Sequence, residues 1–188
     1  MLLLMTMLAF FARKPPPMHR RILMARGDMG ELDVPPCKSP LHGVTDEAWT
    51  EFVHALRTQS LGGVSESNGL GEYELKPRRL EDLGVMAALT CTRAPNGRQV
   101  WEGEFVPPLT ADRFLSDPAE QYKALSRSLM DYDRRMDAGE ILRPAGVGRS
   151  GALAILHRAG PGGLRTWSNP AKRFPETQAL YDGAEGIF

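Results

Sequence analysis

The residues of this chain that could do chemistry lie in three short segments. The first runs Gly-Glu-Tyr-Glu-Leu-Lys-Pro over residues 71–77, the second Leu-Ser-Asp-Pro-Ala-Glu-Gln-Tyr over 115–122, and the third Ala-Ile-Leu-His-Arg-Ala-Gly-Pro-Gly-Gly-Leu over 154–164. Glu74 lies in the first and His157 in the third. Glutamate and histidine are frequent proton donors and acceptors in enzyme sites. The segments therefore direct the search to acid–base chemistry and to the elements that hold them in place.

Composition narrows the classes of protein to consider. The chain has 188 residues, of which 42% are hydrophobic and 24% charged, which is typical of a globular protein with a sizeable core. Lys+Arg and Asp+Glu balance at 23 each, which argues against a general nucleic-acid binder. The two cysteines, Cys37 and Cys91, form no CxxC pair, and two buried free thiols are favoured over a single bridge. No histidine and acidic cluster has the spacing of a metal site, and no cofactor is expected.

One glycine-rich motif is set aside. Residues 146–151 read Gly-Val-Gly-Arg-Ser-Gly and fit GxGxxG. A dinucleotide site also needs a preceding strand and a βαβ unit, and residues 140–145 make a poor strand with Pro144 inside it. These glycines are better explained as helix-capping residues.

Local signals predict a mainly α (α+β) fold with one small β-hairpin. The first helix begins at Thr45 or Asp46 and ends at Gly62-Gly63, and the second begins at Pro77 and carries Leu80, Leu83 and Met86. A hairpin then turns at Pro95-Asn96-Gly97 within residues 89–105. A long helix follows from Asp117-Pro118 to Gly139, an apolar helix is capped by Ser150 and ended by Gly160-Pro161, and a last helix covers about 175–184. Residues 45–188 are therefore expected to form the globular domain.

Residues 1–44 are expected to form an irregular arm. Met1–Ala12 is almost wholly apolar, and Pro15-Pro16-Pro17 follows it. The apolar run is too short for an ordinary membrane-spanning helix and lacks the basic start of a secretory signal. A segment packed against a partner, or an extension from a misassigned start codon, is favoured over a membrane-associating anchor.

In this order the three segments resemble the signature of the soluble lytic transglycosylases, relatives of goose-type lysozyme that cut peptidoglycan glycan strands. The matching positions are Gly71, Leu75, Pro77, Leu83, Gly84, Asp117, Pro118, Ala159, Gly160, Pro161, Gly162, Trp167 and Pro175-Glu176-Thr177. The resemblance covers roughly residues 45–188 and implies a lysozyme-like fold, in which residues 87–114 with the hairpin are an insertion. It further implies cleavage of the bond between N-acetylmuramic acid and N-acetylglucosamine.

The departures from the family pattern concern catalysis. The family has a Glu-Ser pair at the end of a helix, where this chain has Gln59-Ser60. A carboxylic acid in a partly apolar cleft keeps its proton and can deliver it to a glycosidic oxygen, whereas an amide cannot. Gln59 stands at the family's acid position, Glu66 is a candidate for a relocated acid, and Glu74, which replaces a family Gln, is a third. Glu66 and Glu74 could equally be solvated surface charges.

Four residues are candidates for substrate binding through the resemblance: Gly71, Tyr73, His157 and Gly160. Tyr73 could stack on a sugar, although a place in the core is the stronger alternative. His157 and Arg158 replace a family Tyr-Asn pair, and a structural histidine is favoured over a catalytic one on this apolar helix.

The resemblance and its departures lead to two hypotheses about function. The first is a peptidoglycan-cleaving enzyme of the lytic transglycosylase type. The second is a catalytically inactive relative, such as a phage tail or baseplate component, that contacts other tail proteins through residues 1–44. The corresponding locations are the bacterial cell envelope or periplasm and the phage virion.

Overall fold

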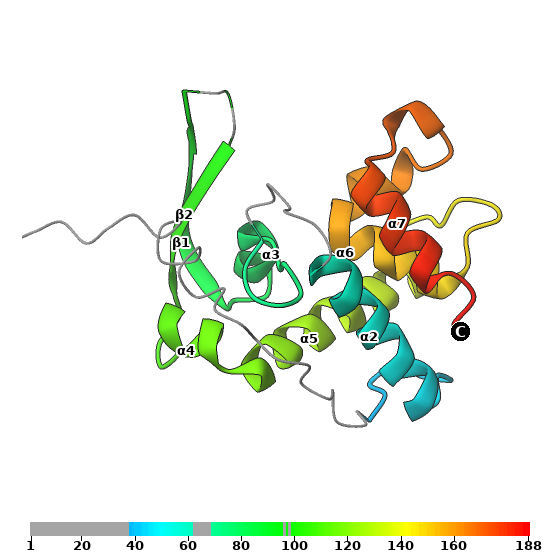
Figure 1. Ribbon diagram of the computed structural model, residues 1–188, viewed down its shortest axis with the longest axis horizontal. Helices are drawn as coiled ribbons and strands as arrows, with labels where there is room; N and C mark the ends of the chain where they lie inside the picture. Colours follow the sequence, from blue (N-terminus) through cyan, green and yellow to red (C-terminus); the bar gives the residue numbers. More distant parts are fainter. Residues whose placement is uncertain (1–37, 62–68, 96, 98) are drawn as a thin grey trace, which may run out of the picture.

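The computed structural model describes residues 38–61, 69–95, 97 and 99–188, and has a mainly helical α+β fold with one two-stranded sheet. The sheet, α3 and α4 lie on one side of the molecule, and α2, α6 and α7 lie on the other (Figure 1). The long helix α5 runs between the two sides. The elements are α2 (Asp46–Leu61), α3 (Pro77–Asp82), β1 (Met86–Arg93), β2 (Gln99–Phe105), α4 (Ala111–Ser116), α5 (Pro118–Asp137), α6 (Arg149–Arg165), the 3-10 turn η1 (Pro170–Lys172) and α7 (Pro175–Ala184).

The starts of α2 and α5 follow from local side-chain capping, as the sequence predicts. The Asp117 carboxylate accepts a hydrogen bond from the backbone N–H of Ala119 at the start of α5 (2.9 Å). Thr45 does the same for the N–H of Ala48 at the start of α2 (3.2 Å). Gly139, with a φ of 72°, ends α5. The predicted boundaries of α2, α5 and α7 are confirmed.

Other predictions were wrong in detail. Met86 belongs to β1 and not to the helix of Leu80, because α3 ends at Asp82. The N-cap of α6 is Gly148 rather than Ser150. Gly160 breaks α6 as predicted, with a φ of 65° and a ψ of −173°, but the chain resumes helical geometry at Pro161 and continues to Arg165. The short helix α4 was not foreseen at all.

The hairpin pairs β1 and β2 antiparallel, with Met86 opposite Phe105 and Arg93 opposite Gln99. It projects from the helices (Figure 1), so most of its residues are at least partly exposed. For this reason Cys91 is exposed, where the sequence predicted a buried thiol. Cys37 lies outside the described residues.

The core lies where α2, α5, α6 and α7 pack together. Its largest fully buried side chains include Trp49, Phe52, Leu125, Leu129 and Ile155, and Phe114 of α4 belongs to the same cluster. Leu41 and Val44 also belong to this core, so the packed body includes residues ahead of Thr45. In the described part of the chain, no helix combines the length and the apolar character needed to cross a bilayer.

Candidate functional site

The first segment forms a tight, buried turn. Leu70 and Leu75 close it through two backbone hydrogen bonds of 2.9 and 3.0 Å. Gly71 has a φ of 72° and Glu74 a φ of 50°, both in the left-handed region. Glycine takes this conformation without steric cost, whereas at Glu74 the surroundings must compensate for it. We refer to residues 70–75 as the central turn.

The second segment holds the central turn through Gln121 on α5. The Glu72 backbone N–H donates to Oε1 of Gln121 (2.6 Å), and Nε2 of Gln121 donates to the Leu115 carbonyl (3.1 Å). Gln121 is 1% exposed. A Cβ atom added to Gly71 would collide with the side-chain amide of Gln121, which is itself buried and hydrogen-bonded, so the close approach favours glycine.

The third segment holds the turn through His157 on α6. The imidazole donates a hydrogen bond to the backbone carbonyl of Tyr73. Burial lowers the pKa of His157 from the usual 6.5 to about 4; the hydrogen bond to Tyr73 opposes this shift, and the positive charges of Lys76 and Arg79 add to it. The ring is therefore neutral near pH 7 and serves as a fixed donor to the turn.

The neighbour of His157 makes a second contact with the same turn. Nη1 of Arg158 forms an ion pair with Oε2 of Glu74, and the two side chains are 14% and 4% exposed. Burial lowers the pKa of Arg158, and the nearby charge of Glu176 opposes that shift. Glu74 and Arg158 are both departures from the family pattern, and the structure brings them together across 84 positions of sequence.

A further ion pair ties the central turn to α2. Nε of Arg57 lies 3.0 Å from Oε2 of Glu72, with the side chains 10% and 3% exposed. Sequence reasoning missed both residues, as well as the role of Gln121. No short-range signal identifies Arg57 and Glu72 as partners, because they are distant in sequence and each resembles an ordinary surface charge.

The structure brings four of the predicted site residues together and leaves two undefined. Gly71, Tyr73, Glu74 and His157 meet at the central turn. Gly160 lies at the break in α6, three positions beyond His157. The backbone of Gln59 belongs to the last turn of α2, but its side chain and all of Glu66 lie outside the described residues.

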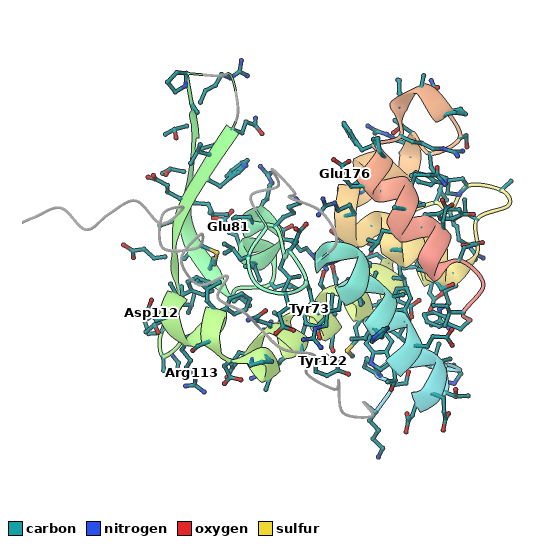
Figure 2. The ribbon with its side chains drawn as sticks, viewed as in Figure 1. Tyr73, Glu81, Asp112, Arg113, Tyr122 and Glu176 are labelled. Atoms are coloured by element: carbon teal, nitrogen blue, oxygen red, sulfur yellow. The ribbon has the colours of Figure 1, made fainter. Side chains whose placement is uncertain are left out.

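The environment of these residues limits what they can do. Tyr73 is 3% exposed and lies inside the molecule (Figure 2), so its ring offers no face to a sugar. The adjacent guanidinium of Arg158 stabilises the negative charge of Glu74, and this is the wrong form for a proton donor. His157 is 8% exposed and hydrogen-bonded to backbone. The cluster therefore supports the architecture and is poorly suited to proton transfer.

A pocket of about 440 Å³ adjoins this cluster. Arg158 belongs to both, and the other side chains that line the pocket include Lys76, Thr166, Lys172, Phe174 and Glu176. Figure 2 shows Glu176 on the first turn of α7, beside α6. We call this space the cationic pocket, since three of its four charged side chains are positive.

Neither a group of metal ligands nor a similar protein identifies what this site does. Within the described residues, no group of three or more His, Cys, Asp and Glu side chains could hold a metal ion. Comparison of the chain with protein-family models, curated proteins and solved structures found no match.

The Glu74–Arg158 pair can be tested by exchange for the amides of the family pattern. Glu74→Gln and Arg158→Asn should each lower the free energy of unfolding by about 3 kcal/mol, because each removes the ion-pair partner of a largely buried charge. The double variant should lose no more than either single variant, which corresponds to a coupling energy of about 3 kcal/mol or more in urea denaturation. Glu140→Gln, at an exposed pair with Arg135, is the control and should cost less than about 1 kcal/mol. Additive losses in the double variant would contradict the pairing.

The neutral state of His157 predicts a specific pH dependence. A histidine whose pKa is lowered by folding stabilises the protein fully above pH 6.5, and this stability falls as the pH drops from 6.5 towards 4. Between pH 7.5 and 4.5, wild type should lose about 2–3 kcal/mol more than His157→Gln, measured by urea unfolding. The same change at the exposed side chain of His42 is the control. Identical pH profiles for wild type and His157→Gln would show that the imidazole is not buried in its neutral form.

The contact between Gly71 and Gln121 predicts unequal effects of alanine at two glycines. Gly84, with a φ of 67°, has no atom within 4 Å of an added Cβ, so Gly84→Ala should cost only about 1 kcal/mol for its backbone conformation. Gly71→Ala adds a collision with Gln121 and should cost about 3 kcal/mol in total, because buried hydrogen bonds are also lost. Thermal or urea denaturation measures both, and equal losses would refute the close approach.

Proposed function

We propose that residues 45–188 form a lysozyme-like domain that engages the glycan strands of peptidoglycan. One observation carries the proposal: the three segments that resemble the lytic transglycosylase signature meet at a single place. Gln121 of the second segment, and His157 and Arg158 of the third, all hold the central turn of the first. Chain connectivity does not require this meeting, since α5 and α6 are long helices that could present many other residues to the turn.

The departures from the family pattern at this place compensate one another. The family has Gln where this chain has Glu74, and Asn where it has Arg158. Because the new carboxylate and the new guanidinium form an ion pair, the exchange alters charge without leaving either group alone. A mutually adjusted pair supports a retained architecture with altered chemistry.

Two of the three candidate acids are poorly suited to proton donation. Glu74 is committed to Arg158, and Gln59 carries an amide, so a lytic reaction of this chain depends on Glu66. In that reaction the acid protonates the glycosidic oxygen, and its carboxylate then draws a proton from the sugar 6-hydroxyl to give the anhydro product.

The ion pair of Glu74 with Arg158 also favours a second function within the same fold. In this alternative the domain binds glycan without cutting it and belongs to a phage tail or baseplate, with residues 1–44 available to other tail proteins. The first alternative concerns the bacterial cell envelope, and the second concerns the virion.

The decisive experiment measures binding to purified sacculi and release of muropeptides together. Wild type is expected to sediment with sacculi. Muropeptide release by wild type that Glu66→Gln reduces at least about 100-fold would identify Glu66 as the acid. Binding without release, with release gained in Gln59→Glu, would identify the non-catalytic alternative.

A matched variant and a failure criterion complete the design. Glu51→Gln makes the same chemical change at an exposed residue of α2 and should behave as wild type. A correctly folded chain that neither binds nor cleaves sacculi refutes the proposal.

A further inference from the structure

A second hollow, of about 650 Å³, lies between α3 and α5 (Figure 1) and is lined by residues of both helices. Its lining holds four arginines, three carboxylates, Leu83 and Met130. It shares no lining residue with the cationic pocket, and none of the side chains that hold the central turn belongs to it. We call this separate feature the α3–α5 groove.

Three of the four arginines are already paired inside the groove. The Asp131 carboxylate lies 2.9 Å from Nη2 of Arg79 and 3.1 Å from Nη2 of Arg134. Nε of Arg135 lies 3.2 Å from the carboxylate of Glu140. These contacts occupy the charged groups on both sides, so the three arginines are not the first choice of an incoming ligand.

The fourth arginine, Arg127, is held in place without a carboxylate. Its Nη2 donates to the Leu83 carbonyl at the end of α3 (2.7 Å), and no carboxylate of the described residues forms an ion pair with it. The side chain is exposed, and most of its N–H groups remain open to a ligand. A guanidinium anchored in this way suits a carboxylate, because it offers a planar fork of donors and has lost part of its freedom before binding.

Met130 places an apolar group next to this guanidinium. It follows Arg127 by three positions on α5, so the two side chains lie on the same face of the helix. Its side chain is 44% exposed, which makes it one of few large hydrophobic groups of the described residues that face solvent. A flexible methionine adapts to partners of different shape, and a partner that covers it removes apolar surface from water.

The full charge balance of the lining selects a single carboxylate over a polyanion. Four arginines against three carboxylates leave a net charge of only +1. Asp82 also lines the groove, and no cation of the described residues forms an ion pair with it. A phosphate dianion or a nucleic-acid backbone would therefore be repelled by Asp82 and Glu140 once Arg127 was neutralised. A peptide can instead bring one carboxylate and an apolar side chain to the groove, and leave polar groups near Asp82.

We infer that the α3–α5 groove binds a short acidic segment of a partner protein, in which an Asp or Glu side chain pairs with Arg127 and a neighbouring large apolar side chain covers Met130. A second copy of this chain docked groove to groove is a poorer occupant, because two hollowed surfaces would then face each other. The inference does not depend on the proposed function, since the groove lies outside the residues on which that function is argued.

Peptide selection on the full chain tests the inference. A random dodecapeptide library is selected on immobilised wild type and then depleted of peptides that bind Arg127→Glu. The remaining peptides should be enriched in Asp or Glu beside Leu, Met, Phe or Trp, and their affinity in fluorescence anisotropy should fall as salt is raised. For such a peptide, Arg127→Gln should weaken binding about two- to fivefold, and Arg127→Glu about tenfold or more.

A charge exchange and two further variants make the outcome specific. Replacing the acidic residue of the selected peptide by Lys should weaken binding to wild type and restore binding to Arg127→Glu. Met130→Ala should weaken binding about three- to tenfold at every salt concentration, because the apolar contact does not depend on charge. Arg165→Glu changes an exposed arginine of α6 outside the groove and should leave binding unchanged. Circular dichroism should agree for all variants, since the substituted side chains are exposed.

Three results would overturn the inference. They are a selection that yields no peptide dependent on Arg127, a set of dependent peptides without Asp or Glu, and a charge exchange that restores nothing. A wild-type dimer that Arg127→Glu dissociates in analytical ultracentrifugation would assign the groove to a second copy of the chain instead. Binding to sacculi should be the same for wild type and Arg127→Glu, so the proposed function and this inference stand or fall separately.

Discussion

The described structure depends on how a short turn is buried among three helices. A turn with two left-handed residues has backbone groups that no regular ladder satisfies, and such groups must find partners when they are buried. Here the partners are Gln121 on α5 and His157 on α6, and the side chains of the turn add ion pairs to α2 and α6. The positions of three helices are thereby tied to one six-residue element.

The two glutamates of the turn make its placement among the helices specific. Glu72 and Glu74 stand on either side of buried Tyr73 and pair with arginines from different helices. Two buried ion pairs contribute little net stability, because the charges lose their hydration. A shift of the turn by one residue would break both pairs and place Tyr73 where a carboxylate now lies. The pairs therefore act against misplacement of the turn more than they increase stability.

The parts of this arrangement that the sequence predicts are those with local causes. Asp117-Pro118 at the start of α5 and the turn near Gly97 follow rules that span a few residues. The helix of Leu80 was extended to Met86 because a spacing of three suits a helix, although the chain had already turned into β1. The six-residue α4 offers too few positions for a periodic pattern to be recognised.

The sequence selects residues that meet in the structure, but it does not predict the contacts that they make there. The segment order marked Gly71, Glu74 and His157, which do meet. The pairing of Glu74 with Arg158 connects residues 84 positions apart, and a single sequence carries no sign of such a contact. From the sequence alone the two residues are separate departures from the pattern and Glu74 is a candidate acid, and it is the ion pair with Arg158 that argues against this role.

The pairing of Glu74 with Arg158 also bears on whether the central turn can supply a general acid. A general acid needs burial that disfavours its charge and no cation close by, as in the lysozyme pattern. Glu74 has the burial, but the guanidinium of Arg158 lies directly beside its carboxylate. Arg158 in turn forms a wall of the cationic pocket, so the ion pair that removes Glu74 from acid chemistry also fixes one side of a space that Lys172 and Phe174 leave open. The same contact thus weakens the case for catalysis at the turn and holds one wall of the adjacent pocket in place.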